Sequence, residues 1–249
     1  MSVAILGSTG RLGRILHAAW PEARFFGRSA SARDIQGCTA LIDLRGVVNG
    51  QGNLSLNVNI ARQALDLAQE AQIAHVFLPS SAAVYGRLGA DLTEDQAAPI
   101  APYGKAKLEM EQMAAGHAQP ATCLRIANVA GVDAILGGWR PGFTLDQMPD
   151  GRTPLRSYIG PQSFARVLQA LAALPDLPPV LNLTSPALLA MDALLDAADL
   201  PWTPRPPSDH TIPCVALNTQ RLETYVSFAP NECSAQGIVA QWREMKDAL

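Results

Sequence analysis

Short apolar runs alternate with longer amphipathic segments along the first half of the chain. Five apolar runs have the length of buried strands: residues 3–6, 24–27, 39–44, 74–78 and 121–126. The segments between them carry apolar side chains at helical spacing, most clearly at residues 54–71 and again up to about residue 115. Strands separated by helices predict an α/β fold, in which helices cover both faces of a parallel sheet.

The pattern loosens beyond residue 130, where prolines are frequent and the segments are short. A helix at residues 163–174 and a strand at residues 180–183 are expected to return to the sheet. Residues 201–207, which begin and end with proline, are expected to form a stiff connector, and Pro79 is expected to stop the strand before it.

A glycine-rich turn, Gly7-Ser-Thr-Gly-Arg-Leu-Gly13, follows the first predicted strand directly. Its glycines allow a tight turn, a close approach of the backbone to a pyrophosphate, and packing of the next helix against the sheet. That helix is expected from residue 13 to 20, and its N-terminal N–H groups favour an anion. The turn could also lack a ligand; its place in a βαβ unit favours dinucleotide binding.

Tyr103 and Lys107 lie one helical turn apart, so their side chains share one face of the predicted helix. An ammonium this close to a phenol is expected to lower the pKa of Tyr103 and to let the pair move protons near neutral pH. Each residue could instead have an ordinary surface role. Their position downstream of the glycine-rich turn favours catalysis on a nicotinamide dinucleotide.

Composition narrows the class of protein. The chain of 249 residues is 48% hydrophobic and 16% charged, with a net charge of -3 and no basic stripe, which argues against nucleic acid as a partner. No apolar run has the length of a membrane span. The four cysteines lack metal-ligand or redox spacing, so we expect no metal site and reduced thiols in a cytoplasmic protein.

Five sequence blocks together resemble the extended short-chain dehydrogenase/reductase family, in its NAD-dependent epimerase/dehydratase branch. They are Gly7-Ser-Thr-Gly-Arg-Leu-Gly13, Asn57-Val-Asn-Ile-Ala61, Ser80-Ser-Ala-Ala-Val-Tyr-Gly86, Pro102-Tyr-Gly-Lys-Ala-Lys107 and Leu124-Arg-Ile-Ala-Asn-Val-Ala-Gly131, with a fainter sixth at Leu155-Arg-Ser-Tyr-Ile159. The resemblance implies a Rossmann-type doubly wound core at residues 1–131. It also implies a small C-terminal substrate lobe at 132–249, interleaved with core elements returning at about 157–184, and a homodimer paired through two long helices.

The resemblance also implies roles for individual residues. Ser81, Tyr103 and Lys107 would be catalytic: Tyr103 as the acid or base, Lys107 on the nicotinamide ribose, and Ser81 on the substrate oxygen. Cofactor contacts would come from Gly7, Ser8, Thr9, Gly10, Arg11, Leu12, Gly13, Arg28, Leu44, Arg45, Gly46, Asn57, Tyr103, Lys107 and Ile126. Substrate contacts would come from Ser80, Ser81, Asn128 and Arg156, with Arg156 pairing with the diphosphate of a nucleotide sugar.

Several positions depart from the family pattern. Ala82 and Ala83 stand where dehydratases carry two acidic residues, so a dehydratase is disfavoured. Only about twelve residues, 28 to 39, separate the second predicted strand from the third, which predicts a reduced adenosine pocket with Asp34-Ile35 as a remnant of its wall. The usual His-Val-x-Asp is replaced by Gly160-Pro-Gln-Ser163, so the substrate could also be a small carbonyl compound or a lipid-like molecule.

The choice of cofactor depends on two arginines. The acid expected at the end of the second strand, which would bind the adenosine ribose of NAD, is replaced by Arg28. An arginine suits a 2′-phosphate that a carboxylate would repel, so NADP is favoured over NAD. Arg45 stands where family members mostly have a small residue, so it would either lie near the phosphates or point outward.

Two functions follow from these patterns. The first is an NAD(P)-dependent oxidoreductase or epimerase acting on a hydroxyl or carbonyl of a sugar-like, small-molecule substrate. The second is a non-catalytic NAD(P)-binding sensor or assembly protein that keeps the fold. The complete set of Ser81, Tyr103 and Lys107 favours the enzyme.

Overall fold

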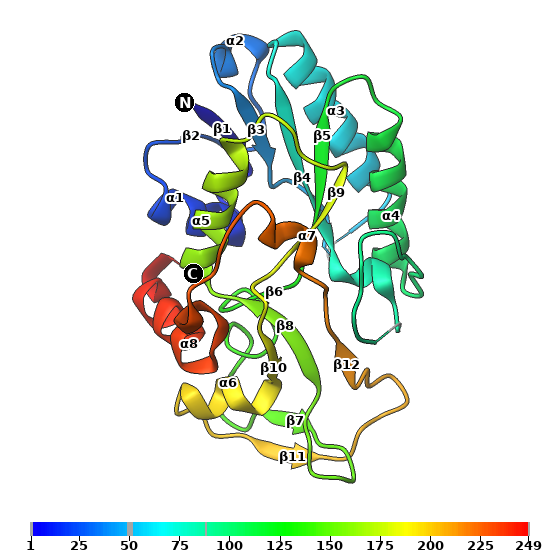
Figure 1. Ribbon diagram of the computed structural model, residues 1–249, viewed down its shortest axis with the longest axis vertical. Helices are drawn as coiled ribbons and strands as arrows, with labels where there is room; N and C mark the ends of the chain where they lie inside the picture. Colours follow the sequence, from blue (N-terminus) through cyan, green and yellow to red (C-terminus); the bar gives the residue numbers. More distant parts are fainter. Residues whose placement is uncertain (1, 49–51, 88, 249) are drawn as a thin grey trace.

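A six-stranded parallel sheet forms the centre of the molecule (Figure 1). A computed structural model describes residues 2–48, 52–87 and 89–248. In the order β2-β1-β3-β4-β5-β9, the strands are β1 (Val3–Leu6), β2 (Arg24–Phe26), β3 (Ala40–Asp43), β4 (His75–Ser81), β5 (Ala121–Ile126) and β9 (Val180–Leu183). The predicted α/β class and parallel sheet are confirmed, as is the returning strand at residues 180–183.

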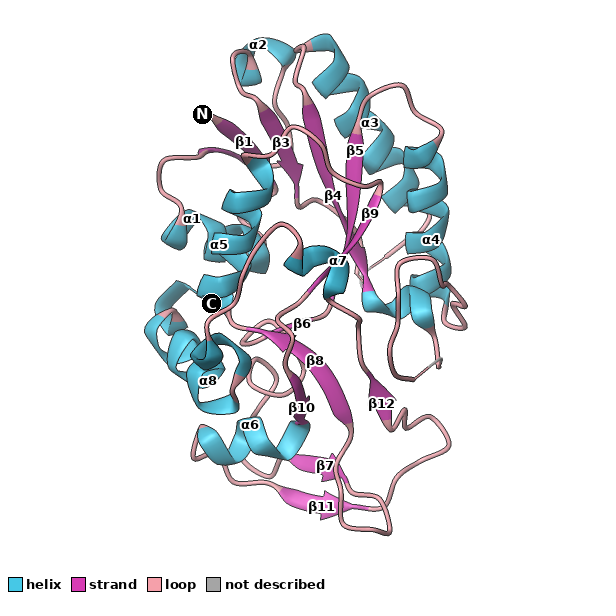
Figure 2. Cartoon of the chain, viewed as in Figure 1, coloured by secondary structure: helices cyan, strands magenta, loops and turns pink. Residues whose placement is uncertain are grey.

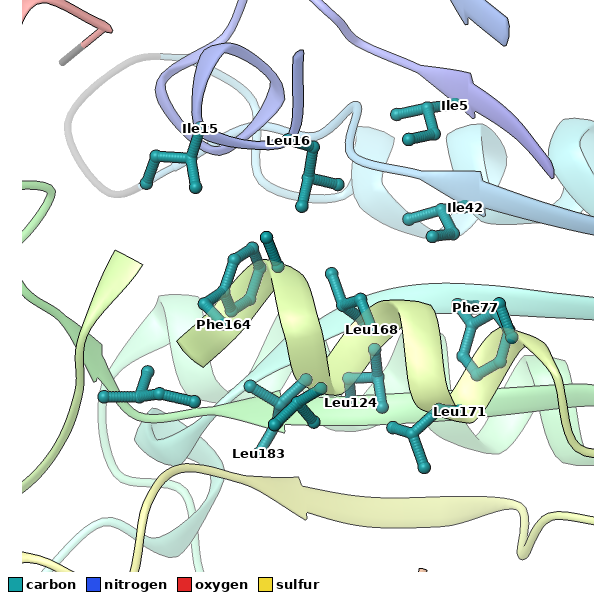
Figure 3. Packing of buried hydrophobic residues seen from close by; sticks show 14 of the residues in the cluster. Ile5, Ile15, Leu16, Ile42, Phe77, Leu124, Phe164, Leu168, Leu171 and Leu183 are labelled. Atoms are coloured by element: carbon teal, nitrogen blue, oxygen red, sulfur yellow. The ribbon is translucent and has the colours of Figure 1, made fainter. Parts of the chain in front are cut away.

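Helices cover both faces of the sheet. One face carries α1 (Arg11–Ala19) and α5 (Pro161–Ala172), and the other carries α3 (Leu56–Glu70) and α4 (Pro102–Ala115). Figure 3 shows the first layer, where Phe164 and Leu168 of α5 face Ile15 of α1 and the buried strand residues. The helical spacing of apolar residues at 54–71 is explained by α3, whose buried alanines and leucine pack against the sheet.

Several predicted boundaries differ from the structure, among them the returning helix, which was expected at 163–174 and is α5 at Pro161–Ala172. Helix α1 begins at Arg11, before the third glycine, with Gly10 as its N-cap. Strand β4 does not stop before Pro79 but continues to Ser81, and β3 pairs with it only as far as Phe77. A residue without an N–H is tolerated where one side of the strand has no ladder partner. Residues 203–205, expected as a connector, form strand β11 (Thr203–Arg205) on β7 (Thr144–Asp146).

The connection between β2 and β3 is as short as the sequence predicted. It contains only α2 (Ala32–Ile35), a single turn whose cap is Ser31. The Ser31 hydroxyl accepts from the Asp34 backbone N–H, and the Asp34 carboxylate accepts from Ser31 in return. No further strand lies beyond β2 in the described residues, so β2 is the edge of the sheet.

A second group of elements lies below the carboxyl ends of the parallel strands (Figure 2). Its sheet places β8 (Leu155–Ile159) between β10 (Leu188–Ala190) and β12 (Cys214–Val215), and β6 (Asn128–Val129) also pairs with β8. The remaining elements are η1 (Ala82–Tyr85), α6 (Met191–Ala197), α7 (Gln220–Glu223), η2 (Pro230–Cys233), α8 (Ala235–Glu244) and η3 (Lys246–Ala248). No helix within the described residues is long and apolar enough to span a membrane.

Candidate active site

A cavity of about 260 Å³ opens at the carboxyl ends of β3, β4 and β5. Open parallel sheets bind their ligands at this edge. Ser81, Tyr103 and Lys107 all line the cavity, so the structure brings together the three residues predicted to be catalytic. Each comes from a different part of the fold: Ser81 ends β4, and the other two lie in the first two turns of α4.

Tyr103 and Ser81 form one polar pair in this cavity. Burial raises the pKa of the Tyr103 phenol, and a side-chain hydrogen bond with Ser81 lowers it in part. The expected net lowering by Lys107 is therefore wrong, because loss of water around the ring disfavours the phenolate more strongly than its neighbours favour it. A phenol with a raised pKa is protonated at neutral pH, which makes it a proton donor.

Lys107 is buried, with 4% of its surface exposed. Its Nζ donates to the carbonyl oxygen of Pro79 at 2.7 Å and to Oδ1 of Asn57 at 3.4 Å, and lies 5.8 Å from the centroid of the Tyr103 ring. Burial lowers the pKa of Lys107 to about 8, and the nearby Cys123, Asp43 and Glu111 offset part of this effect. The amine is therefore mostly charged at pH 7 but close to titrating.

The glycine-rich turn has the geometry that a dinucleotide requires. A Cβ on Gly13 would lie 2.3 Å from the carbonyl oxygen of Gly7, so only glycine allows α1 to start this close to the strand. Gly7 has a φ of +82°, which also favours glycine. The turn therefore leaves a bare backbone at the start of α1, which fits a phosphate group. Leu12 is the residue of the turn that lines the cavity.

Arg45 does not point away from the sheet. Its guanidinium forms a bidentate ion pair with Asp43, with Nε at 2.8 Å from Oδ1 and Nη2 at 2.9 Å from Oδ2. Its Nη1 donates to the carbonyl oxygen of Arg28 at 2.9 Å. Leu44, Arg45 and Gly46 all line the cavity, so the structure places this departure from the family pattern beside the site.

The other predicted cofactor residues are more dispersed. The Arg28 side chain is exposed, and Arg11 donates to the carbonyl oxygen of Val132 at 2.7 Å. Asn57 is buried and braces the loop after β3, accepting from the N–H of Val47 and donating to its carbonyl, both at 3.0 Å. Ile126, at the end of β5, lines the cavity.

The predicted substrate residues divide between two cavities. Ser80 and Asn128 line the first, although the Ser80 hydroxyl donates to Glu111 and Asn128 donates to the carbonyl of Ser157 at 3.2 Å. Arg156 lines a second cavity of about 430 Å³ in the lower lobe. The two cavities flank one loop, since Asp133 lines the first and Ala134 the second.

The second cavity is rich in basic side chains. Arg140, Arg156, Arg205 and His210 line it, and Asp146 is its acidic residue. Asp146 already accepts from the Arg205 Nε and, at 2.6 Å, from the Thr211 hydroxyl. Arg156 donates to the backbone carbonyls of Leu155 and Ile212, both at 2.8 Å, which fixes its guanidinium beside the cavity.

Sequence reasoning missed the polar network behind the site. Glu111, one turn after Lys107 on α4, forms a buried ion pair with Arg125 of β5, with Nη2 at 2.8 Å from Oε2. Arg125 also donates to the carbonyls of Glu94 and Gln96. The spacing of Glu111 from Lys107 was the available signal, since residues four apart share a helix face. Asp43 was missed too, because nothing in the sequence paired it with Arg45.

Comparison with known proteins agrees with this geometry. Residues 44–137 match the model of the NAD dependent epimerase/dehydratase family, a segment that holds all three predicted catalytic residues. Over this segment, the match confirms the family resemblance predicted from the sequence motifs. No curated protein matches the sequence.

Solved structures share the fold of this chain over nearly its whole length. The tunicamycin biosynthesis protein TunA, an NAD dependent NDP-hexosamine 5,6-dehydratase, has a TM-score of 0.77 at 17% identity over 98% of both chains. WbmG of Bordetella bronchiseptica, in complex with NAD, has a TM-score of 0.75 at 17% identity over 98% of this chain and 94% of its own. A UDP-galactose 4-epimerase has a TM-score of 0.74 at 17% identity over 100% of both chains.

Proposed function

We propose that this protein is an NAD(P)-dependent oxidoreductase or epimerase that transfers hydride at a hydroxyl- or carbonyl-bearing carbon of a nucleotide sugar. The observation that carries the proposal is the convergence of Ser81, Tyr103 and Lys107 on one cavity beside the glycine-rich turn. The family match supports a nicotinamide cofactor. Solved structures with the same fold include proteins in complex with NAD and UDP-glucose.

A nicotinamide cofactor bound here would give or take the hydride, and Tyr103 would move the accompanying proton. Its raised pKa keeps the phenol protonated, so a proton is in place for the oxygen of a carbonyl group whose carbon receives hydride. Ser81 bonds the same substrate oxygen and orients it. The charged Lys107 would hold the cofactor ribose, and its charge favours the phenolate that remains after proton transfer.

The second cavity supports a nucleotide sugar over a small carbonyl compound. Its three arginines can neutralise a diphosphate, and arginine suits this role because its planar fork binds two phosphate oxygens at once. The loop shared by the two cavities allows one ligand to place its sugar near Tyr103 and its diphosphate near Arg156. Ala82 and Ala83, in place of two acids, continue to favour an epimerase or reductase over a dehydratase.

The finer preference for NADP is also part of the proposal. Arg28 follows the edge strand β2, at the position where NAD-binding proteins carry a carboxylate that would repel a 2′-phosphate. Its exposed side chain has no ion pair among the described residues. We further propose a homodimer that pairs through α3 and α4, which lie side by side as the outer layer of one sheet face. Size-exclusion chromatography with light scattering tests this pairing, and a monomeric mass would contradict it.

A Tyr103→Phe variant tests catalysis directly. It removes the phenolic hydroxyl and keeps the ring, so turnover is expected to fall by about 10²–10⁴-fold while the dissociation constant for the cofactor changes little. Turnover is followed by nicotinamide absorbance with a panel of nucleotide sugars, and binding by calorimetry. The rival function, a non-catalytic NAD(P)-binding sensor, predicts that the variant keeps its biological activity in full.

A further inference from the structure

The guanidinium of Arg45 lies across the edge where a dinucleotide enters. Asp43 ends β3 and Arg28 follows β2, and β1 lies between these two strands. The Arg45 side chain, anchored on Asp43, therefore crosses the carboxyl end of β1 to reach the carbonyl of Arg28. The same strand leads into Gly7, where an added Cβ would lie 3.0 Å from the backbone nitrogen of Arg45.

This guanidinium still has donors for an anion. Arg45 has five N–H donors, and its bonds to Asp43 and Arg28 use three of them. Its side chain is 16% exposed, whereas that of Asp43 is 1% exposed. The carboxylate is thus sealed beneath the arginine, and the open side of the pair presents a cation.

The carboxylates near this edge are already engaged. Asp43 is neutralised by Arg45, and Asp34 accepts from the N–H and hydroxyl of Ser31 in the single turn of α2. Because α2 is the only helix between β2 and β3 in the described residues, it builds little wall around an adenosine ribose. The Arg45 guanidinium therefore meets the backbone of Arg28 at an edge where the described carboxylates, Asp43 and Asp34, already have partners.

We propose that Arg45, together with Arg28, forms a binding site for a phosphate monoester on the adenosine ribose of the cofactor, and that Asp43 is the residue that positions Arg45. Two guanidinium groups would then bind the ribose phosphate where the shortened connection between β2 and β3 leaves the adenosine pocket open. This inference rests on the proposed function, because it needs a cofactor in the glycine-rich turn. Beyond the proposed role of Arg28, it assigns Arg45 as a second residue that binds this phosphate and Asp43 as the residue that holds Arg45 in place.

Calorimetry on the full chain tests the site with NADPH, NADH and adenosine 2′,5′-bisphosphate. In Arg45→Gln the dissociation constant for NADPH is expected to rise about 10-fold or more, and that for NADH less than 3-fold, because a charge-assisted bond to phosphate is lost. Asp43→Asn is expected to show the same selective loss. Arg33→Gln removes an exposed charge from α2 nearby and is expected to change neither constant.

The outcomes separate this inference from the proposed function. Equal weakening of NADPH and NADH in Arg45→Gln would show a structural role only and overturn the inference, as would an unchanged NADPH constant. Binding of neither cofactor to the wild type would overturn the proposed function as well. If the variants fail to fold, the wild type still decides: adenosine 2′,5′-bisphosphate is expected to bind at least 10-fold more tightly than adenosine 5′-phosphate, and equal binding would overturn the inference.

Discussion

At the scale of single residues, the buried amine of Lys107 is the group with the clearest pH signature. Its pKa in the folded state is about 8, below the ordinary lysine value of 10.5. Between these values the unfolded chain binds more protons than the folded one, so raising the pH through this window stabilises the folded state. Burial of Lys107 therefore lowers the free energy of unfolding in full below pH 8, and this cost disappears toward pH 10.5.

We therefore expect the free energy of unfolding of the wild type to rise relative to Lys107→Met by about 1 kcal/mol per pH unit between pH 8 and pH 10. Urea denaturation of both proteins at four pH values measures this difference, in which the other titrating groups cancel. Lys105→Met, at an exposed position on the same helix, is the control. The same pH dependence in both comparisons would contradict the assignment to Lys107.

Sequence reasoning succeeded at the residue scale where spacing alone decides proximity. Tyr103 and Lys107 share a helix face by their spacing, and Ser81 meets them because β4 ends beside α4. It failed where burial decides chemistry, since the direction of the Tyr103 pKa depends on how much water the fold removes. It also left the orientation of Arg45 open, because that depends on Asp43 and on a carbonyl of another strand.

At the scale of elements, the junction of β1 and α1 depends on the absence of a side chain at Gly13. An added Cβ would lie 2.3 Å from the carbonyl oxygen of Gly7 and 2.7 Å from the backbone of Ser8, so helix and turn would have to separate. Gly13→Ala is expected to lower the free energy of unfolding by about 1–3 kcal/mol and to weaken cofactor binding. Urea denaturation and calorimetry measure the two effects.

Gly116→Ala is the matched control for this change. An added Cβ there would lie 3.7 Å from its nearest neighbour, the carbonyl oxygen of Met113, and the φ of -89° suits any residue. Its effect on stability is expected to lie within about 0.5 kcal/mol, or to be slightly favourable through the unfolded chain. If both alanines cost the same, the close approach in the turn is not what constrains Gly13.

The elements that the sequence predicted best are those with long, regular patterns. The α4 helix ends at Ala115 as expected, and β9 covers the predicted residues 180–183. Two of the errors occurred at prolines, because a proline is compatible with a strand wherever its nitrogen faces no ladder partner. Pro79 lies in β4 and Pro204 in β11, and neither position could be recognised without knowing the pairing of neighbouring strands.

At the scale of the whole molecule, Arg125 joins parts of the chain that are distant in sequence. It pairs with Glu111 of α4 and donates to the carbonyls of Glu94 and Gln96 at 3.1 and 2.7 Å. The loop that holds Glu94 in turn reaches the C-terminal half, where the backbone N–H of Leu92 donates to the carbonyl of Ala216 at 2.9 Å. One buried guanidinium therefore links the parallel sheet, its outer helix and the segment that runs into the lower lobe.

Arg125→Met should consequently destabilise the protein by about 3–5 kcal/mol, because it leaves the Glu111 carboxylate buried without its partner. Adding Glu111→Leu is expected to recover part of that loss, since the double variant buries no unpaired charge. Arg243→Met, which breaks an exposed pair with Asp199, is the control and should cost less than about 1 kcal/mol. Urea denaturation supplies the free energies, and hydrogen exchange should show faster opening at Leu92 in Arg125→Met alone. A double variant less stable than both single ones would mean that the network acts through packing and not through charge.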